Sequence, residues 1–76
     1  MKELVEFLAK SLVDNPDDVR VHTYEREQAT VIELDVPETE LGKVIGRQGR
    51  TARAIRTILS AAGQKARRRY ILDIVD

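Results

Sequence analysis

The sequence contains no cysteine, no tryptophan and one histidine, and only three of its 76 residues are aromatic. Without cysteine there is no disulfide framework and no thiolate metal site, so packing or oligomerisation must hold a small core together. No apolar run approaches the roughly 18 residues of a membrane-spanning helix, and charged residues interrupt the N-terminal stretch where a signal peptide would be apolar. These absences favour a cytoplasmic protein with no membrane association. A chain of 76 residues is also too short to divide, so residues 1–76 are expected to form a single domain.

The same scarcity bears on catalysis. His22 has no partner ligand in the sequence, and no pair of carboxylates stands at an interpretable spacing, so general acid-base, covalent and metal chemistry lack evident residues. We therefore expect no enzyme, no cofactor, no metal and no catalytic residue. Phe7, Tyr24 and Tyr70 are also too few for a sheet that stacks nucleic-acid bases on exposed rings.

The net charge is zero, but the charges are unevenly distributed along the chain. Residues 1–40 carry four basic and eleven acidic side chains, whereas residues 41–76 carry nine basic and two acidic ones. Such asymmetry indicates that one part meets a polyanion while the rest keeps the protein soluble, or that the halves pair with each other on folding. Composition leaves both interpretations open.

Hydrophobic periodicity predicts the secondary structure. A period of 3.6 indicates amphipathic helices, a period of two indicates strands, and proline and glycine mark the breaks. Thr39 is the expected N-cap of a short helix, and Gly63 is the expected C′ residue of a long one. The predicted elements are a helix over 4–13, a turn over 14–18, strands over 19–24 and 29–36 with a hairpin turn at 25–28, a short helix before Gly46, a helix from 50 to about 62, and a strand over 69–75.

This order, α-β-β-α-α-β, predicts an α+β fold. A hairpin followed by a two-helix crossover gives a three-stranded sheet with helices on one face. If the last strand lies beside the second, a right-handed crossover makes that pair parallel and the sheet mixed.

Two glycines stand three positions apart in the stretch VIGRQGRTARAI, which begins at Val44. A P-loop needs a glycine where Val44 stands and a lysine where Arg50 stands, so that motif is excluded. The dinucleotide fingerprint also needs a glycine at position 44, and it follows a strand and not a short helix. The remaining interpretation is a turn between two helices.

In that turn, a left-handed Gly46 closes the first helix, and the missing side chain of Gly49 lets another backbone approach. The free N–H groups at the start of the second helix attract anions, and Arg47 and Arg50 flank them. Sugar-phosphate is the ligand that this arrangement favours. The apolar side chains nearby are expected to wall a groove leading toward the second strand: Val44, Ile45 and Ile55.

The residues from Val44 to Gly49 resemble the (V/I)-I-G-x-x-G signature of the KH domain, whose GXXG loop clamps about four nucleotides of single-stranded nucleic acid. The element order is similar to that of type II KH domains, and the length is similar to that of small bacterial single-KH proteins of the KhpA family. The resemblance implies an RNA-binding protein that acts as an RNA chaperone or post-transcriptional regulator. It also implies a homodimer, or a heterodimer with a second KH-domain protein.

The resemblance assigns roles residue by residue. Gly46 and Gly49 are the loop glycines, and Arg47 and Gln48 are the variable residues nearest the phosphates. Added charge at the edges comes from Lys43 and Arg50, and further along the helix from Arg53. Arg53 and Arg56 are equally well explained as solvated surface, and residues 65–69 either extend the basic surface or pair with the acidic half. A KH-shaped module acting mainly by dimerisation or partner binding remains the alternative function.

Overall fold

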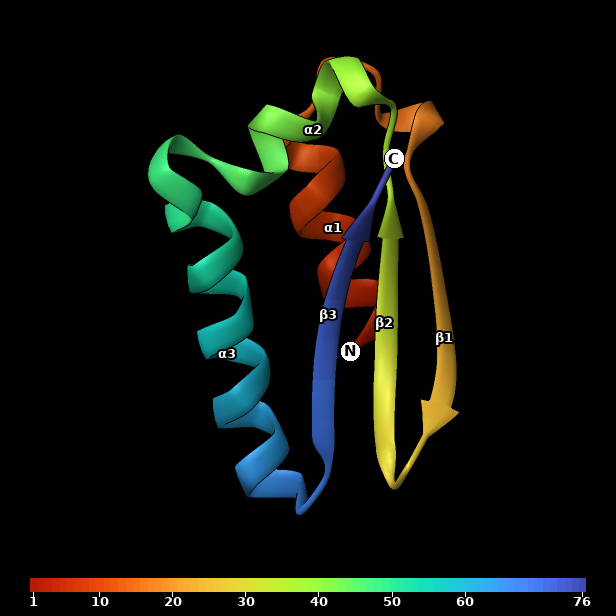
Figure 1. The fold of residues 1–76 in the computed structure, drawn as a ribbon, viewed down its shortest axis with the longest axis vertical. Helices are drawn as coiled ribbons and strands as arrows, with labels where there is room; N and C mark the ends of the chain where they lie inside the picture. Colours follow the sequence, from red (N-terminus) through yellow and green to blue (C-terminus); the bar gives the residue numbers. More distant parts are fainter.

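Helices and strands follow one another in the predicted order in the computed structural model, which describes residues 1–76 (Figure 1). Two single turns of 3-10 helix, at Pro16–Asp18 and Arg47–Gly49, connect the longer elements. The main elements are α1 (Lys2–Leu12), β1 (Arg20–Arg26), β2 (Ala29–Asp35), α2 (Glu38–Ile45), α3 (Arg50–Ala66) and β3 (Arg69–Val75).

The sheet has the order β1-β2-β3, with β2 in the centre. β2 is antiparallel to β1, with Leu34 opposite Val21, and parallel to β3, with Ile32 opposite Leu72. The mixed sheet is therefore confirmed. The parallel pair requires the crossover through α2 and α3, which returns the chain to the same end of the sheet before β3 begins.

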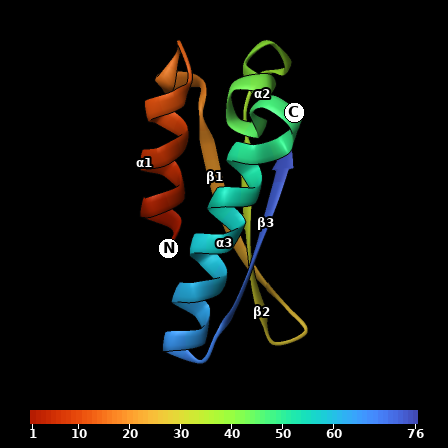
Figure 2. The same ribbon diagram turned by 90° about the vertical axis from the view of Figure 1, so that its left-hand side faces the viewer.

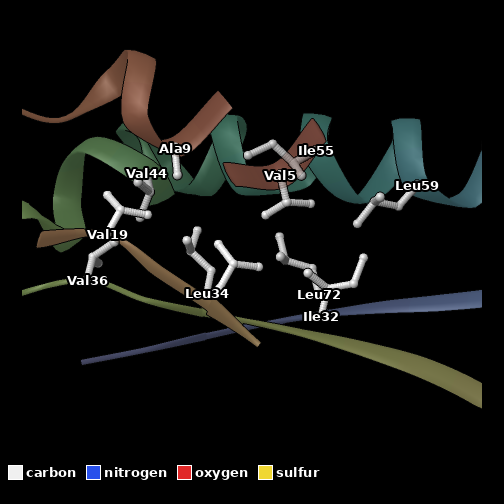
Figure 3. Close-up of a cluster of buried hydrophobic side chains, with 11 residues drawn as sticks. Val5, Ala9, Val19, Ile32, Leu34, Val36, Val44, Ile55, Leu59 and Leu72 are labelled. Carbon is white, nitrogen blue, oxygen red and sulfur yellow. The ribbon is translucent and has the colours of Figure 1, made fainter. Parts of the chain in front are cut away.

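All three helices cover one face of the sheet (Figure 2). Val5 and Ala9 of α1 and Ile55 and Leu59 of α3 point down onto the sheet, where alternate strand residues such as Leu34 meet them (Figure 3). Burial of these aliphatic side chains is the main force that holds the two layers together. No helix combines the length and the apolar composition needed to cross a bilayer.

The opposite face of the sheet carries no helix, yet Val31 is only 1% exposed there. Its cross-strand neighbours are Tyr24 on β1 and Ile71 on β3, so a short apolar row crosses all three strands. Cross-strand neighbours on one face of a sheet lie close enough for large side chains to cover a smaller one between them. This row explains how a strand residue without a helix above it is buried.

The turn between β1 and β2 is shorter than predicted. Glu25 and Arg26 belong to β1, and only Glu27 and Gln28 form the turn, with φ values of 50° and 67°. Two consecutive residues with positive φ match the handedness that a two-residue hairpin requires. The sequence lacks the Asn-Gly or Asp-Gly pair that usually marks such a turn, so polarity alone made the predicted loop too long.

Two predicted helix boundaries are wrong. Thr39 is not the N-cap of α2, because Pro37 takes that position and the N–H of Glu40 already bonds the Pro37 carbonyl at 2.8 Å. Gly63 does not end α3, which continues to Ala66 and terminates at Arg67 in the left-handed conformation. Gly63 is needed because a Cβ there would overlap the backbone carbonyl oxygen of Arg68, where the chain folds back over the helix.

Candidate nucleic-acid interface

Gly46 ends α2 with a backbone conformation that side chains do not tolerate. Its φ of 79° is positive as predicted, but its ψ of 170° makes the residue extended and not left-handed helical. This region of φ and ψ is essentially open only to glycine. A Cβ at Gly46 would also lie 2.7 Å from the Cβ and 2.9 Å from the backbone nitrogen of Thr51. Gly46 is therefore required both by its conformation and by the space that it leaves for α3.

Gln48 and Gly49 are left-handed one after the other, with φ values of 58° and 75°. The N–H of Gly49 donates to the Gly46 carbonyl at 3.0 Å, which closes the loop into a single tight turn. A Cβ at Gly49 would meet nothing within 4 Å. The backbone at Gly49 therefore borders open space, which is the property that a close-approaching ligand backbone needs.

The start of α3 has the electrostatics of an anion site. No side chain caps the N-terminus of this 17-residue helix. The N–H of Arg50 donates to the Arg47 carbonyl, and the N–H groups that follow it have no side-chain acceptor. The guanidinium of Arg50 donates to Oε1 of Gln48 at 3.1 Å, and that of Arg53 reaches the Gln48 carbonyl at 3.5 Å. These contacts place two arginines beside the loop, and Arg47 is exposed within it.

None of these three arginines is neutralised by a carboxylate. The five ion pairs of the structure involve other residues, and α3 contains no aspartate or glutamate. The positive charge at this end of the molecule is therefore available to a ligand.

The apolar residues predicted to wall a groove are placed differently from one another. Val44 is 0% and Ile55 is 4% exposed, and both pack in the core (Figure 3). Ile45 is partly exposed. Val44 and Ile55 thus support the loop from below, and of the three only Ile45 offers surface to a base. Spacing on a helix identifies apolar residues, but it does not tell whether they face the core or a groove.

The strand beside α3 is β3, and the groove toward the second strand stays a prediction. The guanidinium of Arg56 donates to the Leu72 carbonyl at 3.3 Å, and Tyr70 approaches Gly63. Figure 1 shows α3 running alongside β3. β2 is the next strand of the sheet, on the side of β3 away from α3. Any ligand that leaves the loop along α3 therefore meets the β3 edge.

Lys43 is held by carboxylates on two sides. Its Nζ lies 2.6 Å from Oδ2 of Asp14 and 3.0 Å from Oε1 of Glu40, and the hydrogen bond to Asp14, followed by that to Glu40, raises the pKa of Lys43. The other oxygen of Glu40 accepts the Asn15 N–H at 2.8 Å. That bond and Lys43 lower the pKa of Glu40, whose side chain is 5% exposed.

This cluster ties the turn after α1 to α2, and so fixes the helix that leads into the loop. Glu40 is not among the residues predicted from the sequence. Its only local signal is the three-residue spacing to Lys43, because Asp14 and Asn15 come from 25 or more positions earlier.

The remaining candidate groups are His22 and the basic run at residues 65–69. His22 is exposed on β1, and no three His, Cys, Asp or Glu side chains cluster as metal ligands. Of the basic run at 65–69, Arg68 pairs with Glu25 at 3.6 Å and Thr30 at 3.0 Å. Part of the charge asymmetry is thus internal pairing, as one of the two interpretations held, while Arg67 and Arg69 make no ion pair.

The chain is similar to known proteins over its whole length. It is 57% identical over 76 residues to the RNA-binding protein KhpA of Aquifex aeolicus, covering 100% of this chain and 96% of that protein. It is 53% identical to the RNA-binding protein KhpA of Halalkalibacterium halodurans, with both chains fully covered. With the protein of the same name from Borreliella burgdorferi the identity is 51%, over 97% of this chain and 90% of the other.

No solved structure gives a significant match. The family model described as KhpA/KhpB, KH domain matches residues 2–74. The type II order of elements, the GXXG loop and these matches agree, and the chain belongs to the KhpA/KhpB family of KH domains.

Proposed function

We propose that this protein binds single-stranded RNA at the loop Gly46–Gly49. One observation carries the proposal: the uncapped N-terminus of α3 meets three arginines that have no carboxylate partner, next to a glycine whose surface is open. The relatives named RNA-binding proteins support RNA as the polyanion.

In this proposal each loop residue has a defined task. The backbone at Gly49 lets a sugar-phosphate approach, and the N–H groups of the first turn of α3 face its oxygens. Arg47, Arg50 and Arg53 supply charge, and the Gln48 amide adds a neutral donor. Ile45 offers apolar surface to a base. Contacts of this kind read the backbone more than the bases, so we expect modest affinity and little sequence preference.

The test is a double substitution, Arg47→Asp with Gln48→Asp. Both side chains are exposed, and aspartate tolerates the left-handed backbone at position 48, so the fold is expected to survive. Binding to a labelled oligouridylate should fall at least about tenfold, because two carboxylates now face the phosphates. Fluorescence anisotropy measures the affinity, and circular dichroism checks the fold.

The matched control is Lys2→Asp with Ser11→Asp on α1, which changes the net charge by the same amount at exposed positions away from the loop. Its affinity should stay close to that of the parent protein, whose binding should weaken linearly with the logarithm of salt concentration. A folded loop variant that binds as tightly as the control would remove the loop from the proposal.

The overall affinity for RNA rises when one weak binding site is linked to a second. Phe7 on α1 is 66% exposed and Ile58 on α3 is 46% exposed, and both helices belong to the layer that faces away from the sheet (Figure 2). We propose that these side chains contact a second copy of the chain, which would bring two RNA sites together and raise avidity. A second KH-domain protein on the same residues is the alternative occupant.

Sedimentation of the parent protein, Phe7→Glu and Ile58→Glu tests this part separately from RNA binding. We expect a dimer for the parent and monomers for both variants. A parent that is monomeric at all concentrations contradicts self-association, and capture of a KH-domain partner that either variant abolishes would then support the interaction-module alternative.

Nonspecific binding of single strands is the property on which RNA chaperones rely. We propose that the protein acts in the cytoplasm as an RNA chaperone or post-transcriptional regulator. An annealing assay with two complementary RNA hairpins tests the chaperone activity: the parent should accelerate annealing, and the aspartate loop variant should not.

A further inference from the structure

A concave site lies at the end of α3 opposite the GXXG loop. It is a pocket of about 570 Å³ where the end of α3, the start of β3 and the β1–β2 hairpin meet, at the lower end of the molecule in Figure 1. Gln64, Arg67, Arg68, Arg69 and Tyr70 line one side, and the hairpin turn closes the other. Tyr70 is the only hydrophobic residue of the lining. The pocket is therefore a polar, basic site and not a defect of core packing.

The backbone around this pocket has positive φ values, as the GXXG loop does. Four non-glycine residues of the chain have positive φ: one is Gln48 in the GXXG loop, and the other three, Glu27, Gln28 and Arg67, all line the pocket. At Glu27 and Gln28 this is the conformation that the two-residue hairpin requires, and at Arg67 it ends α3, so the positive φ values shape the turns that border the pocket. The pocket and the GXXG loop thus share a feature found nowhere else in this chain.

The charge of the pocket suits an anion. Arg68 is engaged with Glu25 and Thr30 and fastens the hairpin to the connection after α3. Arg67 and Arg69 make no ion pair and no side-chain hydrogen bond, and Glu27 is the only acidic residue of the lining. The carbonyl end of α3 favours cations, and Lys65 in the last turn already satisfies that preference. Two guanidinium groups are left over for a ligand.

A continuous polar stripe joins the two sites. Its members recur at three- or four-residue spacing on α3 and so share one face of the helix: Arg53, Arg56, Ser60, Gln64 and, at the helix end, Arg67. The stripe borders β3, because Arg56 bonds the Leu72 carbonyl. Seventeen helical residues span about 25 Å, which is about seven nucleotides of a stacked strand at roughly 3.4 Å each.

We infer that a single RNA strand held at the GXXG loop continues along this stripe, and that one of its later phosphates occupies the pocket between Arg67 and Arg69, beside the ring of Tyr70. The inference rests on the proposed function and extends it, because the loop alone holds about four nucleotides. The protein then binds a strand of about eight nucleotides as one ligand.

The experiment compares oligouridylates of four, eight and twelve nucleotides with the intact protein. Amide chemical shifts, which report millimolar as well as micromolar binding, should change only around residues 46–50 with the four-nucleotide strand. With eight nucleotides they should change around residues 64–70 as well. Affinity should rise at least tenfold from four to eight nucleotides and little more from eight to twelve.

The variant Arg67→Gln with Arg69→Gln should keep the affinity for four nucleotides and lose the gain at eight. Its control, Lys10→Gln with Arg20→Gln, removes the same charge at exposed positions outside the stripe and away from the pocket, and should keep the gain. A pocket variant that retains the gain overturns the inference.

Two further outcomes are informative. If the amide shifts of residues 46–50 change with every strand but those of residues 64–70 change with none, the extended track is wrong while the loop proposal stands. If the shifts of residues 46–50 do not change at all, the proposed function itself fails.

Titration with uridine monophosphate tests whether the pocket binds a phosphate of an RNA strand or a free nucleotide. If it shifts residues 64–70 and no gain with length occurs, the pocket takes a free nucleotide and the RNA track is overturned.

Discussion

At both ends of α3 the chain changes direction through residues with positive φ, but the residue types differ. At its beginning, two glycines with positive φ bracket the loop, and at its end the left-handed position is occupied by Arg67 with no glycine beside it. The glycine of that region, Gly63, lies inside the helix with its own carbonyl bonded to the N–H of Arg68 at 2.8 Å. Glycine therefore provides backbone freedom at one end and room for a returning chain at the other.

The comparison also separates two loop glycines that look equivalent in sequence. Gly46 is fixed by its φ and ψ and by contact with Thr51, whereas Gly49 is fixed by φ alone. Substitutions at these positions should show whether the requirements at Gly46 contribute more to the free energy of unfolding than the requirement at Gly49.

The largest effect is expected from Gly46→Ala. The new methyl group would be forced into a glycine-only conformation against Thr51, which we expect to cost roughly 3 kcal/mol of unfolding free energy. Gly49→Ala should cost only about 1 kcal/mol, since its Cβ enters open space. Urea denaturation of both variants measures the difference. Equal costs would mean that neither the glycine-only conformation of Gly46 nor its packing against Thr51 adds to the cost of a positive φ.

At the other end, Gly63→Ala should cost about 2 kcal/mol, because a methyl group must displace the backbone at Arg68. The helix itself gains from alanine, so the loss isolates the close approach. Denaturation measures it, with Ala61→Gly as a control for helix propensity at an exposed position. Stabilisation by Gly63→Ala would show that the chain can return over α3 without a glycine.

The ion pairs near the two ends should differ in strength and in pH dependence. Glu40→Gln removes a nearly buried carboxylate, and should lower the midpoint of thermal unfolding at pH 7 more than Glu25→Gln, whose parent side chain is 65% exposed. The folded-state pKa of Glu40 is lowered from its ordinary value of 4.5. Its stabilisation is therefore complete above about pH 4.5 and disappears as the pH falls through the folded-state pKa.

Thermal unfolding of the parent and both variants, followed by circular dichroism from pH 7 into acid, tests this prediction. The curves of the parent and of Glu40→Gln should converge in acid. Equal midpoints for the two variants at pH 7 would contradict the assigned difference in burial.

The smallest effect has the opposite sign. Arg67→Gly should stabilise the protein by about 1 kcal/mol, because glycine adopts the left-handed conformation without strain. The same change should weaken binding of an eight-nucleotide RNA. Denaturation and anisotropy on one preparation read both quantities. A substitution that stabilises the protein and leaves RNA binding unchanged would show that Arg67 serves neither the fold nor the ligand.

The sequence predicted the elements well where local patterns decide them. Alternation placed β3 over the residues that the structure has, and the crossover rule gave the parallel pair. Prediction from the sequence failed where a residue's role depends on a contact with a residue far away in the chain. Gly63 depends on Arg68 across a chain reversal, Lys43 depends on Asp14, and the burial of Val44 depends on which face of α2 meets the sheet. The arginine pocket likewise needs the hairpin at Glu27 and Gln28 to close it.

The parallel pairing of β2 with β3 has a consequence for synthesis. Ala29 pairs with Arg69, so the two strands meet only after the 33-residue segment between them, residues 36–68, has emerged and folded. The hairpin of β1 and β2 joins neighbouring segments, so it can form as soon as β2 has emerged. Bringing β3 to β2 closes a longer segment of chain, which costs more entropy and is slower. Since β3 borders the face of α3 along which we propose that RNA binds, a growing chain lacks the complete proposed surface until residues 69–75 have joined the sheet. A ribosome-bound fragment ending before Arg69 should therefore leave nearby transcripts unbound along this track.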